Sequence, residues 1–81
     1  MRHEIAALKH QLAEAKKRLR DLDLEGLGLI IAIRTALNPY EEDITKLNID
    51  QVLVLTKRLH EVWTEMKSLR EKVRRLEEDL G

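Results

Sequence analysis

The sequence lacks cysteine and phenylalanine, and its aromatic residues are limited to Tyr40 and Trp63. Without cysteine the chain forms no disulfide bond and offers no thiolate to a metal, which fits a reducing compartment. With so few aromatic rings it has little to stack against nucleic-acid bases. The composition is instead dominated by Leu, Glu, Lys, Arg and Ala, as is typical of long helices with large exposed surfaces rather than of a compact enzyme.

Long apolar runs are also missing. The longest run, residues 27–33, is too short to span a bilayer and is flanked by Glu25 and Arg34. Residues 1–4 lack the apolar core of a secretory signal. Fifteen basic residues balance fifteen acidic ones in the 81-residue chain, so the molecule as a whole is neither a polycation nor a polyanion. We therefore expect a soluble, cytoplasmic chain that does not contact a membrane.

A seven-residue apolar period runs through both halves of the sequence. Apolar residues recur in alternating steps of three and four, which places them along one seam of a helix, the a and d positions of a coiled coil. In the first half the seam consists of Ile5, Leu8, Leu12, Ala15, Leu19, Leu22, Gly26, Leu29, Ile33 and Ala36. In the second half it consists of Val52, Leu55, Leu59, Val62, Met66, Leu69, Val73, Leu76 and Leu80. If residues whose numbers sum to 88 are paired, the two seams match as an antiparallel pair.

These seams predict an all-α fold: an antiparallel, coiled-coil-like helical hairpin that forms a single domain over residues 1–81. The first long helix is expected over about residues 2–37, because the residue before a proline is disfavoured in a helix and Asn38 precedes Pro39. Asn38 is then expected to cap a short bridging helix over about residues 39–46, whose first turn would hold the acidic residues Glu41, Glu42 and Asp43.

The second long helix is expected over about residues 49–79. Asn48 is its candidate N-cap, and Gln51 lies three residues on, as in a capping box. Within the paired seams Gly26 lies opposite Val62. The large indole of the neighbouring Trp63 is expected to fill the space that the missing side chain of Gly26 leaves, and the alternative is a local adjustment or kink in the first helix.

The half of the hairpin near the turn is too apolar for a two-helix pair to bury. Apolar residues there lie outside the seam as well as on it, and a second copy of the chain is the simplest way to cover them. We therefore expect a homodimer whose turn-proximal halves form a four-helix bundle. The candidate self-association residues are Leu24, Leu27, Ile30, Ile31, Leu53, Val54 and Trp63.

The other half of the hairpin carries a concentration of basic residues, which suggests an alternative function. A basic stripe along this half would bind nucleic-acid phosphates in a salt-sensitive and sequence-blind way. Its candidate phosphate-binding residues are Lys16, Lys17, Arg18, Arg20, Arg70, Arg74 and Arg75. The competing interpretation is a solvated coiled-coil flank in which charges four residues apart pair, as in Glu14 with Arg18 or Glu71 with Arg75.

The remaining polar residues do not form a recognisable catalytic or metal-binding pattern. His3 and His10 are two helical turns apart, too far to share one ion. The acidic residues 41–43 are explained by the helix dipole, and no nucleophile with a neighbouring base or glycine-rich phosphate loop is found. Arg34 lies inside the most apolar stretch. It could pair with Glu42 or Asp43, extend along its own stem to solvent, or pair across a dimer interface, and we expect a structural ion pair whose partner the sequence does not identify. We therefore expect no catalytic residue, metal or cofactor.

Taken from sequence, the chain is expected to be a non-enzymatic helical interaction or scaffold protein. Its expected partner is a second copy of itself, with another protein as a further possibility. The alternative is a small nucleic-acid-associated protein that uses the basic stripe.

Overall fold

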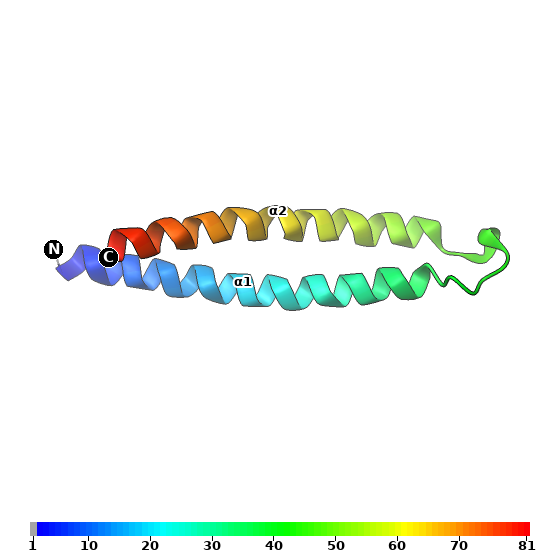
Figure 1. Cartoon of the computed structure of the whole chain (residues 1–81), viewed down its shortest axis with the longest axis horizontal. Helices are drawn as coiled ribbons and strands as arrows, with labels where there is room; N and C mark the ends of the chain where they lie inside the picture. The colour runs from blue at the N-terminus through cyan, green and yellow to red at the C-terminus, as the bar shows by residue number, and fades with distance from the viewer. Residues whose placement is uncertain (1) are drawn as a thin grey trace.

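The computed structural model describes residues 2–81 and shows an all-α helical hairpin. Helix α1 covers Arg2–Ala36 and helix α2 covers Ile49–Leu80, with a single 3-10 turn, η1, at Ile44–Lys46 between them. The two long helices lie side by side and run in opposite directions, so α1 begins and α2 ends at the same end of the molecule (Figure 1). The result is a thin rod of 64 × 15 × 14 Å.

The seam between the helices contains the residues that the heptad period predicts. From Leu8 to Ala36 and from Val52 to Leu80, every predicted seam residue is at least partly buried, whereas Ile5 near the start of α1 is exposed. Leu22 and Val62 are the largest fully buried side chains among residues 3–81, at 0% and 1% exposure. The expected solvent-shielded stripe on each helix is therefore confirmed.

The predicted pairing of the two seams is supported at Gly26. A methyl group added at this glycine would lie 3.5 Å from Cγ1 of Val62, the residue with which its number sums to 88, and 4.0 Å from Cδ1 of Leu59. The expectation that Trp63 fills this space is wrong, because the neighbouring Val62 does so and the indole is 53% exposed. Val62 is at a seam position, while Trp63 is one residue further round the helix.

The connection between the helices is less helical than predicted. α1 ends at Ala36, and the expected short helix over 39–46 is reduced to η1. The reason is local competition for backbone N–H groups. The side chain of Asn38 accepts from the N–H of Tyr40 at 3.0 Å, that of Glu41 accepts from Asp43, and that of Asp43 accepts from Thr45. Asp43, not Asn38, is therefore the capping residue of the bridge.

The predicted start of the second helix is confirmed. Asn48 is the N-cap of α2, and its side-chain oxygen accepts a hydrogen bond from the N–H of Gln51 at 3.0 Å. The reciprocal contact differs from a standard capping box, because the Gln51 oxygen accepts from the side-chain amide of Asn48 at 3.4 Å. The half-buried Leu47 and Val52 flank this cap.

Candidate self-association surface

The two broad faces of the hairpin follow from the residues that flank the seam. With seam residues at heptad positions a and d, positions e and g lie on opposite sides of it. In an antiparallel pair, g residues of one helix face g residues of the other, and e residues face e residues. The hairpin therefore has a g face and an e face, and their chemistry differs.

On the g face, ion pairs join α1 to α2. Arg18 donates two hydrogen bonds to Glu65, at 2.7 and 3.1 Å. Arg58 donates two to Glu25, at 2.5 and 2.8 Å, and a third to Glu61 on its own helix. These hydrogen bonds stabilise the carboxylates and lower the pKa of Glu25 and of Glu65 below the usual value. Two-point contacts of this kind add geometric specificity to the pairing of the helices.

The e face is apolar in the half of the hairpin near the turn. Ile30 of α1 and Trp63 of α2 are both at e positions and lie across the seam from each other, and b residues extend the face outward. Large apolar side chains here are exposed although the helix pair is complete. We call this set the apolar face, and it consists of Leu27, Ile30, Leu37, Ile49, Leu53 and Trp63.

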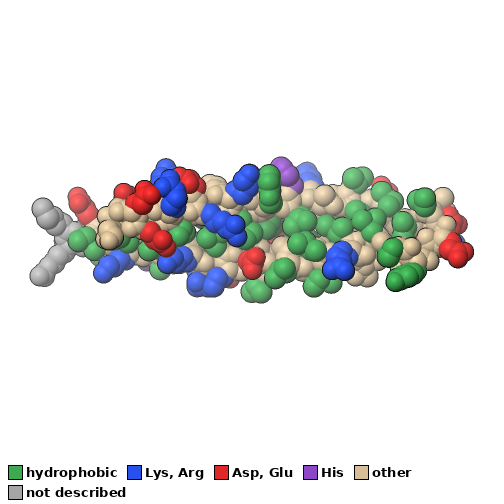
Figure 2. All heavy atoms as spheres, in the orientation of Figure 1, with side chains coloured by type: hydrophobic (Ala, Val, Ile, Leu, Met, Phe, Trp, Pro, Cys, Tyr) green, Lys and Arg blue, Asp and Glu red, His purple; other side chains and the backbone are tan. Residues whose placement is uncertain are grey.

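The type of side chain on the surface also varies along the length of the rod. Hydrophobic side chains gather along the turn-proximal half of the molecule, and charged side chains are concentrated in the other half (Figure 2). At the border between the two, the ammonium of Lys67 lies 4.2 Å from the centre of the Trp63 ring, and the ring of His60 lies 5.5 Å away. Trp63 is thus a surface residue with polar neighbours on its own helix.

The seven residues proposed for self-association are all exposed, but they do not share one face. Four of them, Leu27, Ile30, Leu53 and Trp63, belong to the apolar face. Helical spacing places Leu24 and Ile31 at f positions, on the outer side of α1, and Val54 at a c position, on the opposite side of α2. Sequence reasoning did not include Leu37 and Ile49 in the set. Both residues are at e positions, and once the pairing of the helices is known this assigns them to the apolar face.

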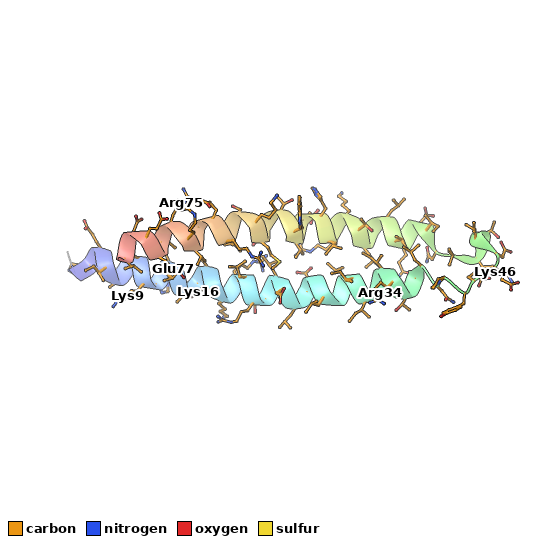
Figure 3. All side chains as sticks on the ribbon, viewed as in Figure 1. Lys9, Lys16, Arg34, Lys46, Arg75 and Glu77 are labelled. Carbon is orange, nitrogen blue, oxygen red and sulfur yellow. The ribbon has the colours of Figure 1, made fainter. Side chains whose placement is uncertain are left out.

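A shallow concavity lies where α1 meets the turn. It has a volume of about 630 Å³ and is lined by Ile31, Ile33, Arg34, Thr35, Leu37, Pro39 and Tyr40. Arg34, labelled in Figure 3, is exposed there and forms no ion pair among residues 3–81. Of the alternatives for Arg34, the pair with Glu42 or Asp43 is therefore not formed within the hairpin, since the Asp43 carboxylate binds the N–H and hydroxyl of Thr45 instead.

The basic residues of the other half are partly engaged by carboxylates. Lys16 of α1 contacts Glu77 of α2 at 3.2 Å (Figure 3), and Arg18 is held by Glu65 on the g face. Arg74 contacts both Glu71 and Glu78 on its own helix. These contacts replace the expected pairs Glu14 with Arg18 and Glu71 with Arg75.

The seven candidate phosphate-binding residues therefore do not form one open stripe. Lys16, Arg18 and Arg74 are in ion pairs, and Arg18 lies on the other face from Lys16 and Arg70. Within residues 3–81 no ion pair is found for Lys17, Arg20, Arg70 or Arg75. This reduces the phosphate-binding capacity that the composition suggested.

Two further features bear on the kinds of site the chain offers. Among residues 2–81, no three His, Cys, Asp or Glu side chains come together in a group that could hold a metal ion. No helix in this part of the chain has both the length and the apolar character that crossing a membrane requires. The apolar face is thus the most prominent candidate site.

Comparison with protein families, with curated proteins and with solved structures finds no match to this chain. The candidate function therefore depends on the geometry of the hairpin itself.

Proposed function

We propose that this chain is a non-enzymatic helical scaffold protein that self-associates through the apolar face and presents its charged half to a protein partner. The assembly would be a homodimer with a four-helix core at the turn-proximal end. The observation that carries this proposal is the exposure of large apolar side chains on one face, while bidentate ion pairs close the other.

The small size of the hairpin core supports association. Among the described residues the buried apolar side chains are Ala15, Leu22, Val62 and Leu76. Chains of this length gain little stability from a single core, and a structure with so few buried side chains benefits strongly from covering more apolar surface. A second hairpin laid on the apolar face supplies that cover, because the same residues meet on both sides of a two-fold interface.

The test is the molar mass of the chain by sedimentation equilibrium over a range of concentrations. We expect a dimer in the native chain and a monomer in the double variant Ile30→Glu with Leu53→Glu, because charges at these positions would have to be desolvated in the interface. Both side chains are exposed in the hairpin, so helix content by circular dichroism should be retained.

Neighbouring residues provide a matched control. Leu53 is 64% exposed and Val54 is 70% exposed, but Val54 lies away from the apolar face. Leu53→Glu alone is expected to weaken the dimer, whereas Val54→Glu is expected to leave it intact. A native chain that stays monomeric at all concentrations would refute the proposal and direct attention to a different partner for the apolar face. Equal effects of the two substitutions would refute this choice of face.

A further inference from the structure

Charge varies along the long axis of the hairpin in a way that the apolar face does not explain. The turn, residues 41–50, holds four acidic residues and one basic residue, a net charge of −3. We call this segment the acidic turn. Residues 16–20 hold four basic residues, and residues 67–75 hold five basic residues and one acidic residue, a net charge of +4 in each segment. We call these two segments, which lie side by side, the basic arm. Lys16, Arg18 and Arg74 are in ion pairs with carboxylates of the hairpin, whereas no ion pair is found within residues 3–81 for Lys17, Arg20, Lys67, Arg70, Lys72 and Arg75.

The acidic turn and the basic arm are about equally far from the middle of the apolar face. Ile30 is near that middle, and residues 16–20 of the basic arm are ten to fourteen residues away, about 15 to 21 Å along the helix. In the other direction α1 continues for six residues to Ala36, about 9 Å, and the turn adds about 12 Å to the length of the rod. The acidic turn therefore extends from about 9 to about 21 Å from Ile30, and its centre lies about 15 Å away.

This spacing distinguishes two ways of pairing the apolar faces. If two hairpins associate with their turns together, acidic turn meets acidic turn and basic arm meets basic arm. If they associate in opposite directions about a two-fold axis near Ile30, each acidic turn lies against the basic arm of the other copy. Only the second arrangement matches opposite charges while burying the same apolar face.

We propose that the partner of the apolar face is a second copy in the antiparallel orientation, with the acidic turn of each hairpin on the basic arm of the other. This inference rests on the self-association proposed above and adds its orientation and its charge contacts. The dimer is then a staggered rod about 85 Å long, compared with about 64 Å for the arrangement with the turns together. In this dimer the end of each hairpin that is furthest from its turn extends beyond the other copy, and the two ends point in opposite directions.

The orientation can be measured with a spin label at Lys46→Cys, because the native chain has no cysteine and Lys46 is exposed in η1. Lys46 lies near the tip of the turn (Figure 3), about 20 Å from the axis, so antiparallel pairing places the two labels about 40 Å apart. Pairing with the turns together places them within about 20 Å. A distance near 40 Å by double electron–electron resonance supports the inference, and a distance below about 20 Å overturns it while leaving self-association in place.

Charge reversal tests the contacts themselves. Glu42 and Arg70 are exposed and form no ion pair within residues 3–81, so Glu42→Lys and Arg70→Glu should leave the hairpin folded. In the antiparallel dimer each substitution alone is expected to raise the dimer dissociation constant roughly tenfold at low ionic strength, since each occurs twice. An equimolar mixture of the two variants is expected to recover native affinity, because both contacts are then attractive in the mixed dimer.

Glu4→Lys serves as the control, since residue 4 lies beyond the overlap of the two hairpins and should leave the dissociation constant unchanged. With the turns together, Glu42→Lys would exchange one like-charge contact for another and would not weaken the dimer. An unchanged dissociation constant for Glu42→Lys therefore overturns the inference. A chain that fails to dimerise at all refutes the self-association proposal instead, so the two failures are distinct.

Discussion

The guanidinium of Arg58 donates two hydrogen bonds to the carboxylate of Glu25, a residue 33 positions away in the chain. This contact joins α2 to α1 on the g face and has a counterpart one heptad along, where Arg18 binds Glu65. Together the two pairs make the g face hydrophilic and leave the e face to carry the apolar surface. The two sides of the rod are therefore suited to different environments.

These ion pairs predict a dependence of stability on pH. The pKa of Glu25 and of Glu65 is lower in the folded hairpin than the ordinary value of 4.5. A carboxylate whose pKa is lowered on folding adds stability above its unfolded pKa and loses that contribution as the pH falls through the folded pKa. We expect the melting temperature at a fixed chain concentration to fall as the pH drops from about 5 to about 3.

The corresponding control is the double variant Glu25→Gln with Glu65→Gln, which cannot titrate at these positions. Its melting temperature should be lower than that of the native chain at neutral pH and should change less on acidification. A native-like pH profile in this variant would show that other carboxylates determine the acid sensitivity.

We predict that the two glycines in the middle of α1 lower the stability of the hairpin and that replacing either one with alanine raises it. Gly26 has room for a methyl group at ordinary contact distance from Val62, and Gly28 has no atom within 4 Å of the position of an added Cβ. Since alanine is favoured over glycine in a helix by about 1 kcal/mol, we expect Gly26→Ala and Gly28→Ala each to raise the free energy of unfolding by up to about 1 kcal/mol. Urea titration followed by circular dichroism measures the change, and a loss of stability in Gly26→Ala would mean that Val62 cannot tolerate the contact.

The centre of the seam is predicted to be sensitive to truncation. Leu22 is fully buried, and Leu22→Ala is expected to lower the free energy of unfolding by about 2–5 kcal/mol through lost burial and the cavity that remains. Val54→Ala, at an exposed position outside the seam and the apolar face, is expected to change it by less than about 0.5 kcal/mol. Similar losses in both variants, measured by chemical denaturation, would contradict the assignment of the core.

Trp63 provides an intrinsic probe of association. It is the single tryptophan in the sequence, is 53% exposed in the isolated hairpin and belongs to the apolar face. We expect its fluorescence emission to shift to shorter wavelength as the chain concentration rises and the indole is covered. In Leu53→Glu the emission should depend little on concentration, and a shift that persists in this variant would place the association surface elsewhere.

The long helices and their pairing were predictable from sequence because a seam repeated over several heptads outweighs local exceptions such as Gly26. The turn was not, because its geometry depends on competition between short polar side chains for the same backbone N–H groups. The side chains of Asn38, Glu41 and Asp43 each accept such a group. In the sequence the same residues are equally compatible with the first turn of a helix.

The sequence was sufficient to predict most residues of the candidate surface, but not which of them lie on the same face. That Leu53 and Ile30 lie outside the seam follows from the heptads, but which of the extra apolar residues share a face requires the register and the e and g flanks. The ion pairs were mispredicted for the same reason. Pairing within one helix suggested Glu14 for Arg18, whereas the antiparallel register brings Glu65 to it from the other helix.

The presence of one hydrophilic face has a consequence for how far assembly can proceed. A rod with an apolar association surface on each of its broad sides could add further copies without limit and form a filament. Here the ion pairs of Arg18 and Arg58 make one side hydrophilic, so two hairpins that met on the other side, as proposed, would present charged groups outward there. If the proposed dimer forms, these charged residues would therefore limit its stoichiometry to two copies.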